Sequence, residues 1–110
     1  MINFTTPTIH LIVEGVDITE KEVYVTLEQG CIELTKKGSD LILEAETDQG
    51  ITNTHITFVL TQRESARFNH NMNASVQVNW IGSNGVRAAT EIKGIKVMKN
   101  LLGEVISYGD

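Results

Sequence analysis

Apolar and polar residues alternate with a period of two through most of the chain, and this pattern limits the fold more than any other feature. In the segment 75–80, for example, Val76, Val78 and Trp80 alternate with polar side chains. Such alternation is typical of a β-strand with one face in a core and the other in solvent. Comparable segments occupy 8–14, 22–28, 32–36, 40–47, 53–60, 75–80 and 86–97. Turn-forming residues separate them, and no long amphipathic helix lies between them.

In the last of these segments, 86–97, the alternation of apolar and polar residues shifts by one residue. The apolar residues between Val86 and Ile92 keep one parity, whereas Ile95 and Val97 have the other. A β-bulge at Gly94 would shift the phase by one residue. The dipeptide Asn84-Gly85 just before the segment favours a tight hairpin turn with two positive-φ residues. The sequence therefore predicts a hairpin whose returning strand is bulged.

One stretch, LTQRESARF at 60–68, carries the start signal of a helix. Thr61 and Glu64 have the spacing of a capping box, in which each side chain bonds the backbone N–H of the other residue. Only a few residues follow before Asn69, so the helix is predicted to be one or two turns long. We interpret it as a structural connection, because catalysis would require further converging groups.

Short strands at regular spacing, with one capped turn between two of them, predict an all-β protein. The expected architecture is an Ig-like antiparallel β-sandwich of about seven strands with one short helical turn, and residues 1–110 form a single domain. Leu60, Glu64, Ala66 and Phe68 resemble the corner at which the chain of such a sandwich passes from one sheet to the other. Phe68 lacks the hydroxyl of a tyrosine corner. From its parity, Trp80 is expected to be a core anchor.

The net charge and the N-terminal sequence argue against several classes of protein. The net charge is −5, and the basic residues are scattered apart from Lys36-Lys37. Nucleic acids and anionic membranes require a concentrated positive surface, so both are disfavoured as partners. No signal peptide and no segment of membrane-spanning length is recognised, which predicts synthesis in the cytoplasm. The single cysteine, Cys31, excludes an internal disulfide and is expected to be a strand residue.

No set of residues has the spacing of a known catalytic or metal site. Oxygen ligands for calcium could come from an acidic strand face, but a solvated surface explains that face better, because EF-hand and repeat spacing are both missing. Three histidines lie far apart in the sequence. We therefore predict no enzymatic activity, no cofactor and no bound metal. The acidic residues are Asp40, Glu44, Glu46 and Asp48, and the histidines are His10, His55 and His70.

Four segments resemble a family of small prophage proteins from Gram-positive bacteria. They are VDITEKEVYVTLEQG, HITFVLTQRESARF, VQVNWIGSNGVRAATEIKGIKV and NLLGEVI. The chain is also similar, more distantly, to the Ig-like N-terminal domain of phage baseplate upper proteins. The resemblance implies a structural or assembly protein of the virion, associated with the baseplate or tail. Such a protein is made in the bacterial cytoplasm and works through protein–protein contacts.

Two other classes remain open: a carbohydrate-binding or host-surface recognition module, and a host-directed effector that binds a bacterial protein. Glycan recognition favours exposed aromatic platforms, and the chain has one Trp and two Tyr. The C-terminal part is rich in apolar residues with little polar cover. We predict that it contacts other virion proteins or a second copy in a homo-oligomer, although it could instead fold back over its own sandwich. The predicted contact residues are Leu101, Leu102, Val105 and Ile106.

Overall fold

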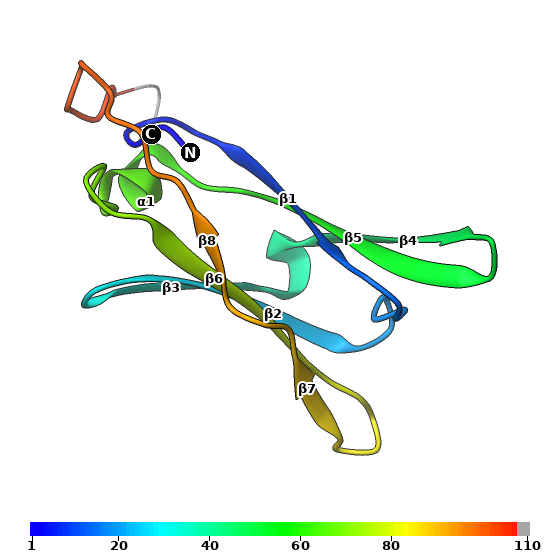
Figure 1. Cartoon of the computed structure of the whole chain (residues 1–110). Helices are drawn as coiled ribbons and strands as arrows, with labels where there is room; N and C mark the ends of the chain where they lie inside the picture. The colour runs from blue at the N-terminus through cyan, green and yellow to red at the C-terminus, as the bar shows by residue number, and fades with distance from the viewer. Residues whose placement is uncertain (108–110) are drawn as a thin grey trace.

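Two antiparallel sheets face each other in the structure, a computed structural model that describes residues 1–107 (Figure 1). One sheet has the order β1-β5-β4, with β1 at Thr8–Val13, β5 at Ile51–Val59 and β4 at Ile42–Asp48. The other has the order β3-β2-β6-β7, and β8 also pairs with β6. Its strands are β2 (Glu22–Gln29), β3 (Ile32–Lys37), β6 (Ala74–Ile81), β7 (Arg87–Ala89) and β8 (Lys93–Ile95). A 3₁₀ turn, η1, covers Gly38–Asp40, and the short helix α1 covers Gln62–Ala66.

The strand order confirms the predicted all-β, Ig-like sandwich. The two sheets correspond to strands B-E-D and C′-C-F-G of that architecture. Eight strands are present because the predicted returning strand is divided into β7 and β8. Nothing within residues 1–107 occupies the place of strand A beside β1. The last three residues of the predicted domain, 108–110, lie outside the described part of the chain.

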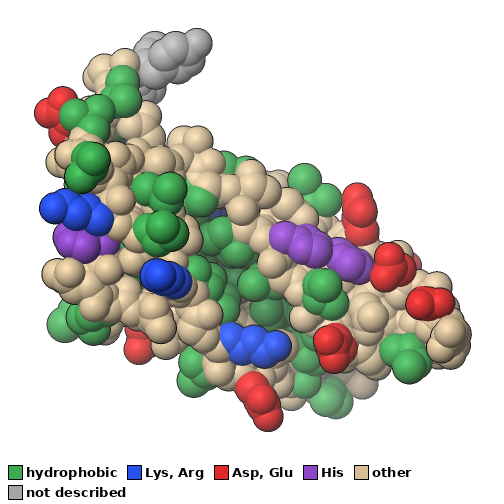
Figure 2. Space-filling model, turned by 45° about the horizontal axis from the view of Figure 1, so that its top comes forward, with side chains coloured by type: hydrophobic (Ala, Val, Ile, Leu, Met, Phe, Trp, Pro, Cys, Tyr) green, Lys and Arg blue, Asp and Glu red, His purple; other side chains and the backbone are tan. Residues whose placement is uncertain are grey.

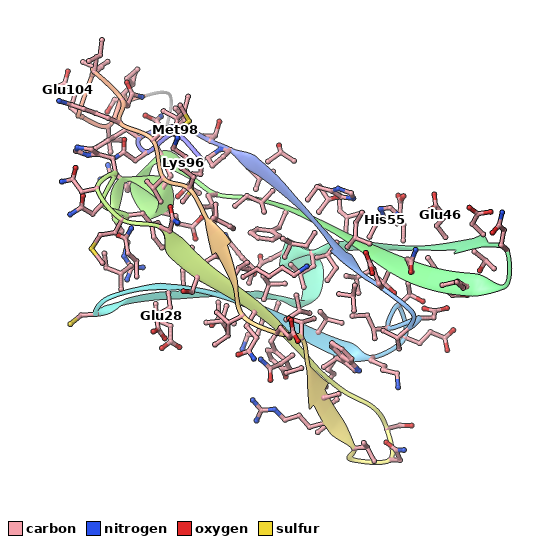
Figure 3. The ribbon with its side chains drawn as sticks, viewed as in Figure 1. Glu28, Glu46, His55, Lys96, Met98 and Glu104 are labelled. Carbon is pink, nitrogen blue, oxygen red and sulfur yellow. The ribbon has the colours of Figure 1, made fainter. Side chains whose placement is uncertain are left out.

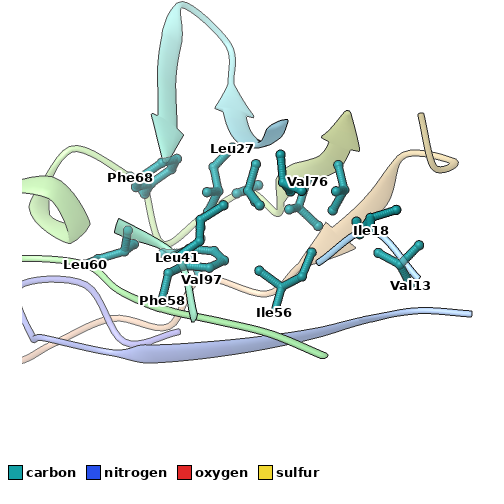
Figure 4. Close-up of a cluster of buried hydrophobic side chains, with 14 residues drawn as sticks. Val13, Ile18, Leu27, Leu41, Ile56, Phe58, Leu60, Phe68, Val76 and Val97 are labelled. Carbon is teal, nitrogen blue, oxygen red and sulfur yellow. The ribbon is translucent and has the colours of Figure 1, made fainter. Parts of the chain in front are cut away.

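The core lies between the sheets, and the alternation of the sequence builds it (Figure 4). Ile56, Phe58 and Leu60 of the β5 segment are buried, as their parity predicts, and so are the inward residues of β2. Burial of each such side chain stabilises the fold by about 1.5–3 kcal/mol relative to exposure. The buried apolar residues are Val13, Ile18, Val23, Val25, Leu27, Leu41, Ile56, Phe58, Leu60, Phe68, Ala74, Val76, Val78 and Val97.

The returning strand does shift by one residue, but not at Gly94. Its register with β6 changes between β7 and β8, so the extra residue lies in the break between them. Thr90 stabilises the break: its hydroxyl accepts the Val78 N–H, and its own N–H donates to the Val78 carbonyl. The turn before β7 also differs from the prediction, because only Gly85 has positive φ (+80°) and Asn84 does not. Sequence parity shows that a bulge exists, whereas side-chain hydrogen bonds decide its position.

The connection from β5 to β6 crosses between the sheets through α1, as predicted. Thr61 and Glu64 form both bonds of the capping box. The buried Ser65 hydroxyl accepts the Thr5 N–H at 3.0 Å and donates to the Thr5 carbonyl at 2.6 Å. Phe68 places its ring in the core without the hydroxyl of a tyrosine corner. The helix thus ties the N-terminal residues to the sandwich. Cys31, by contrast, is exposed in the β2–β3 turn and is not a strand residue.

Replacing Thr61 by alanine is expected to lower the free energy of unfolding by about 1 kcal/mol, because the Glu64 N–H loses its capping acceptor. Urea unfolding measures the loss. Arg63→Ala, an exposed change on the same helix, is the matched control and should change stability by less than about 0.5 kcal/mol. If Thr61→Ala leaves stability unchanged but weakens partner binding, the helix is a contact site instead of a connection.

The capping glutamate also links α1 to the neighbouring strand. Lys36 Nζ of β3 lies 2.8 and 2.9 Å from the two carboxylate oxygens of Glu64. Partial burial raises the pKa of Glu64, but hydrogen bonds from Lys36 and the Thr61 N–H outweigh it, so the pKa is lowered overall. The ionised carboxylate is therefore the form that the fold favours.

A lowered pKa in the folded state gives a definite pH dependence. The contribution of Glu64 is present above its unfolded pKa, at about pH 4, and is lost as the pH falls through the folded value. The difference in melting temperature between the unmodified chain and Glu64→Gln should thus be largest near neutral pH and shrink in acid. A difference that stays constant, or grows, as the pH falls from about 6 to 3 would contradict this role.

Candidate functional site

The predicted contact residues lie together in a segment that belongs to no helix or strand. Residues 99–107 leave the sandwich beyond Met98 and project from the end at which the N-terminus lies (Figures 1 and 3). Leu101 has 93% of its surface exposed, Leu102 49% and Ile106 56%, while Val105 is half-buried. None of the four belongs to the core cluster or packs against it. The segment therefore does not cover the open end of its own sandwich with these side chains.

Side chains of the sandwich hold this segment by its backbone. The Asn100 N–H donates to Asn3 Oδ1, and Asn3 is itself buried beneath the corner. Further along, Gln62 of α1 bonds both the N–H and the carbonyl of Ile106, at 2.9 and 3.0 Å. The backbone is anchored at two points, whereas the apolar side chains between them face solvent. This arrangement presents apolar surface instead of hiding it.

A second apolar surface lies along the open side of the sandwich, between β1 and the part of the chain that carries β7 and β8. It is a groove of about 760 Å³. Leu11 and Val13 of β1 line one wall, and Val78 and Trp80 of β6 line the floor. Figure 2 shows hydrophobic side chains gathered in a hollow in the middle of this face, bordered by histidine and lysine side chains. The groove exists because no strand closes this side of the two sheets within residues 1–107.

Trp80 is only partly the core anchor that its parity predicts. Its side chain packs against the core cluster but remains half-buried, because it lies where the open groove exposes one side of the ring. Trp80 points toward the core, as its parity predicts. Its indole is partly exposed because no neighbouring strand within residues 1–107 covers it. The parity of a residue indicates on which face of the sheet its side chain lies. It does not indicate whether other elements cover that face.

Trp80→Ala is expected to destabilise by about 2 kcal/mol, below the 3–5 kcal/mol typical of a fully buried aromatic side chain. The reason is that part of the indole is already in contact with water. Urea unfolding followed by circular dichroism measures the change, since the substitution removes the only tryptophan. A loss below about 0.5 kcal/mol would mean that the ring contributes nothing to the core.

Two histidines that are far apart in the sequence meet on the outer face of the β1–β5 pair. His10 Nε2 and His55 Nδ1 are 3.0 Å apart, and the ring planes differ by 19°. One of these two nitrogens donates the hydrogen bond and the other accepts it, according to the tautomers of the rings. Glu46 Oε1 lies 3.5 Å from His55 Nε2, and Figure 3 shows both side chains on this surface. Diagonal pairing across β1 and β5 brings them together, which the separate strands do not reveal.

The acidic residues considered for calcium do not converge. Glu44, Glu46 and Asp48 are exposed along β4, and Asp40 lies in η1. Within residues 1–107 no group of three or more His, Cys, Asp or Glu side chains is arranged to hold a metal ion. His70 stands apart in the exposed turn before β6.

The fold and these surfaces define a small all-β sandwich domain with an exposed apolar segment and an apolar groove. No family model, no curated protein and no solved structure matches the chain. Among the helices described in residues 1–107, none is long and apolar enough to cross a membrane. Sequence reasoning found the segment 101–106 but missed the groove. The count of about seven predicted strands gave no signal for it, because seven strands also make a complete Ig-like sandwich.

Proposed function

We propose that the protein is a non-enzymatic structural or assembly protein of a phage or prophage particle, associated with the baseplate or tail, and that it acts through protein–protein contacts. The observation that carries this proposal is the anchored segment 101–106, whose apolar side chains are left in solvent. Large exposed apolar patches are unusual on monomeric proteins and mark sites of association.

The backbone of the segment is fixed in the way expected of a surface that binds a partner. Asn3 and Gln62 fix its backbone, so less conformational freedom is lost when a partner covers it. Leu101, the most exposed of its apolar side chains, gains the most from being covered. Contacts with another protein recover this apolar area, whereas nucleic acid would meet a chain of net charge −5.

Support for the particle comes from the sequence resemblance. The segments HITFVLTQRESARF and NLLGEVI resemble a family of small prophage proteins, and they contain α1 and the exposed segment 101–106.

The proposal is tested by mass spectrometry of phage-like particles, purified after induction of the bacterium that carries the gene. We expect the chain at a fixed copy number relative to the major tail proteins. Its absence from particles that are otherwise complete, together with its presence in the cytoplasm of the same cells, would overturn the virion role and favour a host-directed effector.

Carbohydrate binding is the second candidate, and the half-exposed Trp80 in the groove favours it. An indole ring with polar neighbours such as His10 and Glu91 is a surface on which a sugar could stack. A glycan array probed with the full chain decides between the two. We expect no binding. Saturable binding that is lost in Trp80→Ala, although circular dichroism shows that this variant is still folded, would favour the glycan function.

A further inference from the structure

We propose that the open edge of β1 receives residues 101–106 of a second copy of this chain as an added β-strand. The inference rests on the proposed function in protein contacts and names both the site and the partner. It joins the two unpaired features of the molecule: an apolar groove beside a free strand edge, and an apolar segment outside any strand.

The backbone of β1 has a free row of hydrogen-bonding groups. The Leu60 N–H donates to the Pro7 carbonyl at 3.0 Å, and the register places Thr8 opposite Val59. Opposite residues of an antiparallel pair alternate between bonded and non-bonded positions. The N–H and carbonyl groups of Thr8, His10 and Ile12 therefore point away from β5. No strand within residues 1–107 pairs with them, and neither a proline nor a Lys blunts the edge inside β1.

Side chains beside this edge lack the cover that a neighbouring strand supplies. Ile9 and Leu11 point inward but remain half-buried, as does Trp80 across the groove. In the Ig-like order, strand A would lie here. An added strand would form hydrogen bonds with the free N–H and carbonyl groups of β1. Every second side chain of that strand would then pack against these three residues. Extended peptides bind other sheets in this way, with backbone bonds for affinity and side-chain pockets for specificity.

The segment 101–106 suits this position in length and pattern. It has six residues, as β1 has. As a strand it would place Leu101, Gly103 and Val105 on one face and Leu102, Glu104 and Ile106 on the other. The face with Leu101, Gly103 and Val105 must point into the groove, because the opposite face would bury the Glu104 carboxylate. Gly103 in the middle then leaves room for the Trp80 indole, which protrudes into the groove.

The segment that fills the site belongs to another copy. In its own molecule Gln62 bonds the N–H and carbonyl of Ile106 next to α1, and the segment projects beyond the end of the sandwich instead of along β1 (Figure 1). The exchange replaces these two bonds with bonds to the β1 edge of the other copy. It leaves the sandwich beside the residues that precede β1, since Met98 pairs with Ile2. Two copies related by a two-fold axis could therefore exchange their segments reciprocally. Such an exchange closes a dimer and leaves no site open for further growth.

Light scattering during size-exclusion chromatography tests the dimer on the full chain. We expect the unmodified chain to dimerise, and both Leu101→Asp/Val105→Asp and Ile12→Pro to weaken dimerisation at least about tenfold. Ile12→Pro removes an N–H that points away from β5, so the β1–β5 ladder keeps its bonds. Ile12→Val, which keeps the N–H, is the matched control and should dimerise normally.

A peptide titration keeps the inference testable if the proline variant does not fold. The peptide KNLLGEVIS, residues 99–107, is added to the full-length Leu101→Asp/Val105→Asp variant, whose only tryptophan lies in the groove. We expect a saturable blue shift of Trp80 emission, absent with a peptide that carries the same two Asp substitutions. A strictly monomeric full chain, or dimers unaffected by both variants together with no response to the peptide, overturns the inference. The virion proposal is decided separately by the presence of the chain in particles.

Discussion

Replacing Phe68 by alanine is expected to lower the free energy of unfolding by about 3–5 kcal/mol. Phe68 has 1% of its surface exposed and lies where the chain leaves α1 for the second sheet. Its removal leaves a cavity between the sheets, and the corner cannot collapse into it because Ser65 and Asn3 fix the neighbouring backbone. Urea unfolding followed by tryptophan fluorescence measures the loss.

Phe68→Leu is the matched control, because it keeps most of the apolar volume without the ring. We expect it to cost less than half of the loss seen for alanine. If both variants unfold at the same urea concentration as the unmodified chain, the ring is not in the core and the sheet-crossing corner is placed wrongly.

Thr54→Val is expected to destabilise by roughly 2–4 kcal/mol although valine has nearly the same shape. The buried Thr54 hydroxyl accepts the Ile18 N–H at 3.0 Å and donates to the Val16 carbonyl at 2.9 Å. Valine leaves both backbone groups without their partner inside the fold, and each such group costs about 1–3 kcal/mol. The loop between β1 and β2 is thereby fastened to β5.

Thr57→Val provides the comparison on the same strand, since Thr57 is only half-buried and the change keeps the β-branched side chain. Thermal melting of the two variants separates a lost hydrogen bond from a general effect of valine in β5. Equal melting temperatures for both variants would show that the Thr54 bonds contribute no net stability.

The alternation of apolar and polar residues was enough to predict the sandwich, because in a strand parity decides which side chains are inside. It placed Ile56, Phe58 and Leu60 in the core correctly. The capping box of Thr61 and Glu64 was equally readable, since both of its bonds lie within four residues. Features that depend on local spacing were therefore accessible from the sequence.

Features that depend on pairing between distant strands were not. The contact of His10 with His55 follows from the β1–β5 register, and the position of the bulge follows from the bonds of Thr90 with Val78. The exposure of Trp80 follows from the lack of a strand beside β1 within residues 1–107. Each requires knowing which strands are neighbours, and parity within one strand carries no such information.

The exposed segment and the groove are the two apolar surfaces on which the proposed assembly rests. The segment was predicted from its apolar residues, and the structure leaves its side chains outside the core cluster. In our proposal the groove accepts an extended strand, with the free groups of His10 and Ile12 at its edge. In the proposed dimer the segment of each chain fills the groove of the other, and the outer faces of the sheets are left for neighbours.

Incorporation into particles is the most direct measurement of whether the segment 101–106 makes the contacts of the virion. Unmodified chain and the Leu101→Asp/Val105→Asp variant, distinguished by isotope labelling, are produced at equal levels in the same induced cells, and their ratio in purified particles is determined by mass spectrometry. Ile42→Asp, a substitution of an exposed apolar residue on β4, is the control. We predict that the unmodified chain exceeds the double variant by at least about tenfold, the ratio expected for a contact difference of about 1.4 kcal/mol, while the control is incorporated normally. Equal incorporation of the folded double variant would contradict the proposed contact.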